Sequence, residues 1–398
     1  MNITSEELLK EARALEPQLQ QWRRTLHRHP EVGFDLPHTK ELVKKALTEM
    51  GYEPKDCGKA GVIALAGGKK PGKTILLRAD MDALPMAEES GEPFASKNPH
   101  AAHTCGHDTH TAMLLGAAKL LMDNKEKVKG RVKFMFQPGE EGYNGCKNMI
   151  ADGLLESPHV DVAFGMHSAS ASDYKTGTVL YSTGSYAASA DAFKVTVHGK
   201  GCHGARPEEG IDPINIITHI HLALQTINSR ERNQKEPLIL TIGQIIAGDA
   251  CNIIPERGYF TGTIRTFNQQ VREHAKRRFI EIVNGMCATF GGHADIEWTT
   301  EMAPTINDPA VTPELLGYIR ELVGEENMAE VPASMGSEDF SEVLLNVPGS
   351  YLNLSFGSKE EGYLFGGHHP KIRHNEDALP IGSAIYAQVA IEWLQHNN

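Results

Sequence analysis

The sequence predicts an α/β protein with two domains. One domain is expected to have a mostly parallel sheet flanked by helices, and a smaller β-α-β-β-α-β domain is expected to be inserted into it. Three observations predict this. The 398 residues, of which 40% are hydrophobic and 23% charged, are enough for two cores. Strand-like and helix-like segments alternate near both ends of the chain, and a strand pattern of period two dominates the middle.

The amino-terminal part alternates helical patterns with short apolar strands. The expected helices are 6–29, 39–50 and 109–122, and the expected strands are 61–66, 74–78, 131–136 and 160–165. The sequence GGKK at 67–70 is expected to be a hairpin turn, because no GKS or GKT of a phosphate loop follows it. Strands that alternate with helices indicate a largely parallel sheet.

The pattern changes near residue 187. The sequence DAFKVTVHGK alternates with period two, which is typical of a half-exposed strand. After this strand we expect helix 213–229, strands 238–246 and 258–267, helix 270–290 and strand 294–299. This order is the ferredoxin-like split βαβ sandwich.

The α/β pattern returns after residue 303. A helix is expected at 313–323, a strand at 351–356 and a last helix at 381–395. We therefore assign 1–186 and 303–398 to one domain and 187–302 to an inserted domain. Such an insertion is tolerated because the termini of a domain often lie close together.

Charge and composition limit the partners. The formal net charge of −12 argues against an extended nucleic-acid or anionic-membrane surface, so we expect a small-molecule substrate. The chain has no apolar leader segment at its start and no run of 18 apolar residues, which predicts a soluble cytoplasmic protein. The six scattered cysteines are expected to be thiols unless a metal ion recruits one.

Three predicted strands end in polar side chains. The first leads to Asp80 and Asp82, the second to Glu140 and Glu141, and the third to His167. Because ligands bind beyond the carboxyl ends of parallel strands, these groups should meet in one crevice. Crowded carboxylates repel one another unless a cation neutralises them. The pattern therefore predicts a metal centre.

Two further segments add possible ligands. HTCGHDTH at 103–110 contains Cys105 and His107, and GGHHP near the carboxyl end adds two histidines. Taken singly, a cysteine is more often a small core residue and a histidine is more often structural. Taken together with the carboxylates, the set suits zinc, manganese or cobalt.

Seven motifs resemble one known family. They are LRADMDALP (77–85), HTCGHDTHTAMLLGAAKLL (103–121), FQPGEEG (136–142), GKGCHGARP (199–207), NIIP (252–255), MGSEDF (335–340) and HHPKIRHNEDALPIG (368–382). They resemble the metal-dependent N-acyl-amino-acid amidohydrolases. This group includes hippurate hydrolases, aminoacylases and auxin-conjugate hydrolases within the zinc aminoacylase–carboxypeptidase superfamily. The resemblance spans nearly the whole chain.

The resemblance implies a site with two neighbouring divalent ions, zinc, manganese or cobalt. Its ligands would be Cys105, His107, Glu141, His167 and His368. Glu140 would be the general base. His368 is preferred to His369 because the ligand of the family precedes the proline by two positions.

The resemblance also implies roles for residues of the inserted domain. His203 would stabilise the reaction intermediate, while Asn252 and Arg265 would contact the substrate carboxylate or the intermediate. The alternatives are a turn histidine at 203 and an ordinary strand salt bridge at Arg265. The inserted domain would serve as a lid and as the surface of a homodimer.

Asp80, Asp82 and Asp108 would not bind the metal ions themselves but would contact the residues that do. For Asp80 and Asp82, the alternative is that they cap a turn and bind Arg78. Tyr143 and Asn144 could shape the pocket.

The function implied is hydrolysis of the amide bond of an N-acyl amino acid to a carboxylic acid and a free amino acid. A dipeptidase or carboxypeptidase of the same superfamily is the nearest alternative. It is disfavoured because peptidases usually have His and Asp where this chain has Asp80 and Cys105. A catalytically inactive metal-binding scaffold is the alternative from another class.

Overall fold

The computed structural model describes residues 3–67 and 72–398, which form two compact units. Unit 1 comprises 1–186, 306–332 and 342–398, and unit 2 comprises 187–305 and 333–341. Unit 2 therefore extends to residue 305, beyond the predicted end at 302, and also takes up 333–341. The prediction places this last segment in the other domain, because the α/β pattern returns after residue 303.

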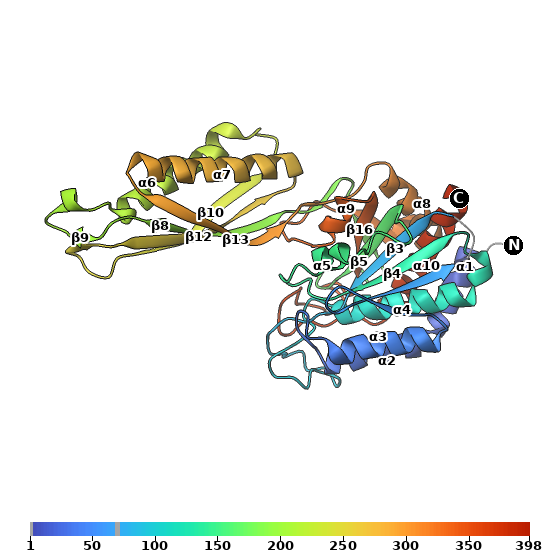
Figure 1. Ribbon diagram of the computed structural model, residues 1–398. Helices are drawn as coiled ribbons and strands as arrows, with labels where there is room; N and C mark the ends of the chain where they lie inside the picture. Colours follow the sequence, from blue (N-terminus) through green and yellow to red (C-terminus); the bar gives the residue numbers. More distant parts are fainter. Residues whose placement is uncertain (1–2, 68–71) are drawn as a thin grey trace. The chain divides into compact units, whose positions relative to one another are not determined.

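Unit 1 contains one large sheet and its covering helices (Figure 1). Its helices are α1 (Ser5–Ala14), α2 (Glu16–Arg28), α3 (Pro37–Glu49), α4 (His107–Asp123), α5 (Gly145–Ala151), α8 (Val311–Val323), α9 (Ser341–Leu344) and α10 (Ala378–Asn397). Its strands are β1 (Lys55–Cys57), β2 (Gly61–Gly67), β3 (Thr74–Asp80), β4 (Arg131–Gln137), β5 (Val162–Ala169), β6 (Val179–Tyr181), β15 (Met328–Glu330) and β16 (Gly349–Ser355). The chain passes between the units within β7 (Ser185–Ala187) and within β14 (Thr305–Ile306), and it passes between them again at each end of 333–341.

The large sheet has the strand order β1-β2-β4-β3-β5-β16-β6-β15. Its centre, β4-β3-β5-β16, is parallel, whereas β2 runs antiparallel to β4 and β6 antiparallel to β16. All seven residues of β3 are buried, as expected for a central strand covered on both faces. The predicted mostly parallel α/β sheet is confirmed.

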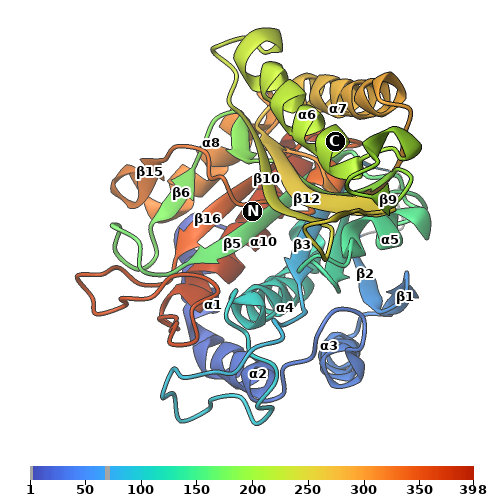
Figure 2. The same ribbon diagram turned by 90° about the vertical axis from the view of Figure 1, so that its left-hand side faces the viewer.

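Helices α4 and α10 pack against each other and against β3, and α2 and α3 pack on α4 (Figures 1 and 2). The single helix predicted at 6–29 is wrong. It divides at Leu15 into α1 and α2, and Pro17 lies in the first turn of α2, where its missing N–H removes no helical hydrogen bond.

The hairpin predicted at 67–70 is also wrong. Strands β2 and β3, which flank it, are not neighbours, because β4 lies between them in the sheet. Residues 68–70 of the predicted turn lie outside the described residues.

Unit 2 is a four-stranded antiparallel sheet with α6 and α7 on one face (Figures 1 and 2). Its main elements are β8 (Ala190–His198), α6 (Pro213–Thr226), β10 (Leu238–Ala247), β12 (Arg257–Thr266), α7 (Gln269–Thr289) and β13 (His293–Met302), with a short pair of β9 (Cys202–His203) and β11 (Ile253–Ile254). The order β-α-β-β-α-β confirms the predicted inserted fold. Among the described residues, no helix is long and apolar enough to cross a membrane.

Candidate metal centre

The carboxyl ends of three adjacent strands carry the predicted polar groups. The sheet order β4-β3-β5 places Asp80, at the end of β3, between the segment after β4 that carries Glu140 and the end of β5 that carries His167. The amino-terminal end of α4 adds Cys105 and His107 at the same edge. The expected convergence is therefore present in the structure.

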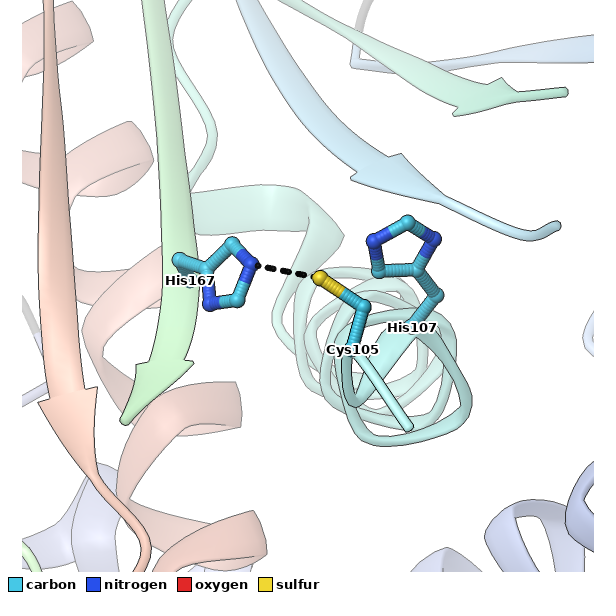
Figure 3. Close-up of side chains that lie close together, drawn as sticks. All are labelled: Cys105, His107 and His167. Carbon is cyan, nitrogen blue, oxygen red and sulfur yellow. Dashed lines mark hydrogen bonds between the residues drawn. The ribbon is translucent and has the colours of Figure 1, made fainter. Parts of the chain in front are cut away.

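Cys105, His107 and His167 form the centre of this cluster (Figure 3). The Cys105 Sγ lies 3.4 Å from the His167 Nε2, and the possible ligand atoms of all three residues lie within 4.8 Å of one another. Cys105 comes from the loop before α4, His107 from its first turn and His167 from β5. Three elements thus direct sulfur and nitrogen donors to one point.

Glu141 and His368 extend the cluster. The His368 Nε2 lies 3.4 Å from Oε1 of Glu141, and the two residues form a second group of possible ligands with Cys105. His368 has a φ of +65°, which is unusual for a residue with a side chain, and its N–H donates to the Thr104 carbonyl. By contrast, His369 stacks on Phe365. The structure brings His368, not His369, to the cluster.

Glu140 lies beside the cluster and is buried. Its Oε2 is 4.0 Å from the His107 Nε2, while the Glu141 Oε1 is 3.9 Å from the same nitrogen. The Asp82 carboxylate holds the turn that carries both glutamates, since it accepts hydrogen bonds from the Glu140 N–H at 2.9 Å and the Glu141 N–H at 3.2 Å. Asp82 therefore holds a turn, as the alternative interpretation predicted, whereas its supporting role toward the metal ligands stays a prediction.

Asp80 is fully buried at the end of β3. Its Oδ2 lies 3.0 Å from the Arg78 guanidinium and 3.4 Å from the His107 Nε2. Burial alone would raise the pKa of Asp80, but Arg78 and the neighbouring histidines hold that pKa well below its usual value. Asp80 therefore stays ionised; it binds Arg78, as the alternative interpretation predicted, and it also faces His107.

The donor set fits divalent metal ions. Within the described part of the chain, both ring nitrogens of His107 and the Oε1 of Glu141 are buried without a hydrogen-bond partner, which is costly unless a ligand satisfies them. Burial raises the pKa of the Cys105 thiol, because a buried thiolate loses its hydration. A metal ion would reverse this effect, since a coordinating thiol is deprotonated. Sulfur, imidazole and carboxylate donors together suit zinc, manganese or cobalt.

Comparison with known families agrees with this geometry. The model of peptidase family M20/M25/M40 matches residues 76–392, which is most of the chain. The chain belongs to peptidase family M20/M25/M40. This confirms the superfamily that the motifs indicated, and the protein is a metal-dependent amidohydrolase.

Relatives of this M20/M25/M40 member have several named activities. The chain is 37% identical over 394 residues to thermostable carboxypeptidase 1 of Saccharolobus solfataricus, and the match covers 98% of each chain. It is 38% identical over 386 residues to N-acetyl-L-cysteine deacetylase of Bacillus subtilis, covering 96% of this chain and 90% of the relative. The YXEP protein of Bacillus subtilis, described as a dinuclear metal-binding peptidase of family M20, matches with a TM-score of 0.79 at 31% identity. That match covers 96% of this chain and 99% of the other.

In this member of family M20/M25/M40, Gly106 lies directly before α4, between Cys105 and His107. Its φ is +89°, and a Cβ there would lie 2.2 Å from the Ser168 Oγ and 3.0 Å from the His374 Nε2. Only glycine fits both the backbone conformation and this space. Cys105 and His107, on either side of it, can therefore turn toward the same cluster.

Asp108, in the first turn of α4, points toward α2. It is fully buried, and its Oδ2 lies 3.0 Å from Nε of Arg23 and 2.9 Å from Nδ1 of His27, both on α2. The other ring nitrogen of His27 lies 3.0 Å from Oε1 of Glu88. Asp108 thus ties the first turn of α4 to α2. Its support for the metal ligands stays a prediction.

The His27 contacts predict a pH-dependent stability. Burial alone would lower the pKa of His27, but Asp108 and Glu88 more than offset this and raise it from 6.5 to about 9. Since the pKa is higher in the folded state, the stabilisation is fully present below pH 6.5 and is lost as the pH rises to about 9. The shift corresponds to about 3 kcal/mol.

Urea unfolding of wild type and His27→Gln at pH 6.5 and 9.5 checks this prediction. Wild type should lose more unfolding free energy over this interval than the variant. An equal loss in both proteins would show that His27 does not carry the effect.

Of the three site residues predicted in the inserted domain, His203 and Asn252 lie close together. His203 is on β9, paired with β11, and the N–H of Gly204 donates to the carbonyl of Asn252 at 2.8 Å. Arg265 is on β12 and donates from Nη1 to the Met335 carbonyl at 3.1 Å. The roles of His203, Asn252 and Arg265 toward the substrate stay predictions.

The sequence analysis gave no role to His110, whose ring lies beside those of His107 and His167. It is fully buried, and burial lowers its pKa to about 4, although Asp80 beside it acts in the opposite sense. The spacing of the histidines in the sequence could have pointed to His110. His107 and His110 are three residues apart and therefore share one helix face, on which their ring centroids lie 5.3 Å apart.

Proposed function

We propose that this protein hydrolyses the amide bond of N-acyl amino acids to a carboxylic acid and a free amino acid. The observation that carries the proposal is the meeting of Cys105, His107 and His167 with the pair Glu140 and Glu141 at one edge of the sheet. N-acetyl-L-cysteine deacetylase, a relative at 38% identity, is named for a reaction of this class.

Cys105, His107, Glu141, His167 and His368 would hold two divalent ions, zinc, manganese or cobalt. When bound, such ions lower the pKa of a water molecule and polarise the scissile carbonyl. The negative and neutral donors of these five residues suit the positive charge of the ions. The ionised Asp80 beside His107 makes the electrostatic potential at the site more favourable for cations.

Glu140 moves the proton. It is buried next to His107, and Asp82 fixes its backbone, so its carboxylate is held in a defined place. It takes a proton from the attacking water and gives it to the departing nitrogen, without which the amine is a poor leaving group. Arg265 would bind the carboxylate of the amino acid, a role that suits a guanidinium in a chain of net charge −12.

A carboxypeptidase is the second candidate, because a relative at 37% identity bears that name. The two reactions are chemically close, since each releases an amino acid with a free carboxylate from an amide. The acyl side of the substrate distinguishes them.

A substrate panel that varies the acyl group and the amino acid independently, run on metal-analysed protein with ninhydrin detection, tests the proposal. We expect the highest kcat/KM for acetyl, benzoyl or other simple acyl groups and little turnover of peptides. Preferred release from peptides would favour the carboxypeptidase. No amine from any substrate, with zinc or manganese added, would indicate an inactive metal-binding scaffold.

We also propose that the protein acts in the cytoplasm as a homodimer formed through unit 2. Size-exclusion chromatography at several concentrations tests the assembly. A dimer that persists on dilution is expected, and a monomer at all concentrations would contradict it.

A further inference from the structure

His110 lies between two proposed metal ligands without being placed as a ligand itself. Its imidazole is fully buried on α4, and its ring centroid is 4.6 Å from that of His167 and 5.3 Å from that of His107. A buried ring in contact with both histidines can influence where they point.

Two hydrogen bonds determine which nitrogen of His110 carries the proton. The backbone N–H of Ser168 donates to His110 Nε2 at 2.7 Å, so this nitrogen must be an acceptor. The Ser168 Oγ lies 2.9 Å from the same nitrogen, so the hydroxyl donates to it as well. Because Nε2 accepts, the ring hydrogen is on Nδ1, which lies 2.5 Å from Oδ1 of Asp80 and donates to it. The ring is therefore held as the neutral Nδ1–H tautomer.

These bonds argue against His110 as a metal ligand. The possible donors of Asp80, His107 and His110 lie within 4.8 Å of one another, and their spacing alone would permit a metal ion. Both ring nitrogens of His110 already have partners, however: Nε2 has the N–H and the hydroxyl of Ser168, and Nδ1 has Asp80.

The bond to Ser168 acts on the neighbouring residue, His167. His167 directly precedes Ser168, and its Nδ1 donates to the Ser168 carbonyl at 2.7 Å. That bond leaves His167 Nε2 facing the Cys105 Sγ, 3.4 Å away. The position of the Ser168 backbone therefore sets the direction of the His167 ring.

We infer that His110 is a positioning residue: its Nε2 anchors the Ser168 N–H at the end of β5 and thereby aims His167 Nε2 at the metal position beside Cys105. The inference rests on the metal site of the proposed function. It adds that a residue outside the ligand set controls metal affinity through one acceptor atom.

Two substitutions separate the two bonds of the ring. The side-chain oxygen of His110→Gln reaches about as far as Nε2, so this variant can still accept the Ser168 N–H. His110→Asn reaches only to the position of Nδ1 and can bond Asp80 but not Ser168. Each variant keeps one of the two contacts, so the two variants form a matched pair. Their unfolding free energies, measured in urea, show whether both are folded.

Calorimetric titration of the metal-free proteins with zinc gives the decisive comparison. We expect His110→Gln to bind zinc close to wild type and His110→Asn to bind it about 10- to 100-fold more weakly, as is usual when a residue that orients a ligand is lost. With cobalt, the thiolate absorption band should shift in His110→Asn only. Equal zinc affinities in the two variants, or a greater loss in His110→Gln, would overturn the inference.

The tautomer can be measured in wild type, so the test does not depend on the variants folding. Nitrogen-15 spectra of the metal-free protein should show His110 protonated at Nδ1 and unprotonated at Nε2. A proton on Nε2 would overturn the inference. If wild type bound no zinc, the proposed function would fail, whereas the tautomer would still decide whether His110 anchors Ser168.

Discussion

Replacing Glu140 by glutamine is expected to lower kcat/KM by at least about 10²-fold, the usual contribution of a general base. Glutamine keeps the shape of the side chain but cannot accept the proton of the attacking water. The Glu140 backbone bond to Asp82 does not involve the side chain, so the turn that carries Glu141 should stay in place. Metal content should therefore remain near that of wild type.

The exposed Glu126→Gln is the matched control, since it makes the same substitution in the short helix Lys125–Lys127, outside the groups of possible metal ligands. It should leave kcat/KM unchanged. Retained turnover in Glu140→Gln, with metal content also retained, would rule out Glu140 as the base. A loss of metal in this variant would instead make Glu140 a ligand.

Replacing Cys105 by alanine is expected to abolish activity through loss of metal. Cys105 belongs both to the group with His107 and His167 and to the group with Glu141 and His368. Its removal should therefore weaken both ion positions. The loss in affinity should exceed the 10- to 100-fold typical of residues that only orient a ligand.

Metal analysis of Cys105→Ala after dialysis, together with kcat/KM, checks this prediction. The exposed Cys251→Ala is the control, and it should keep its metal and activity. If Cys105→Ala retained two ions per chain and normal turnover, the thiol would be a packing residue and the donor set would need revision.

The polar ends of three strands made much of this site predictable. Asp80 ends β3, His167 lies near the end of β5 and Glu140 follows β4, and the rule that parallel strands direct ligands to their carboxyl ends was sufficient to bring them together. The inserted fold was predictable for a similar reason, because the strands and helices of unit 2 are long and strongly periodic.

Other features depend on contacts that sequence patterns do not encode. The three-residue strands β6 and β15 are too short to show alternation, and the break at Leu15 depends on how α1 and α2 pack. Asp108 was expected to support the ligands, which stays a prediction, and its contacts to Arg23 and His27 could not be read from the sequence. The role of His110 required the position of the Ser168 N–H, which arises when β5 and α4 meet.

The most direct test of the central claim is a crystal structure of protein loaded with zinc, with the ions located by their anomalous scattering. We expect two peaks, one about 2.0–2.3 Å from donors of Cys105, His107 and His167 and the other at similar distances from Glu141 and His368. Peaks elsewhere, or ions bound by Asp80 and His110 in place of Cys105 and His167, would contradict the account.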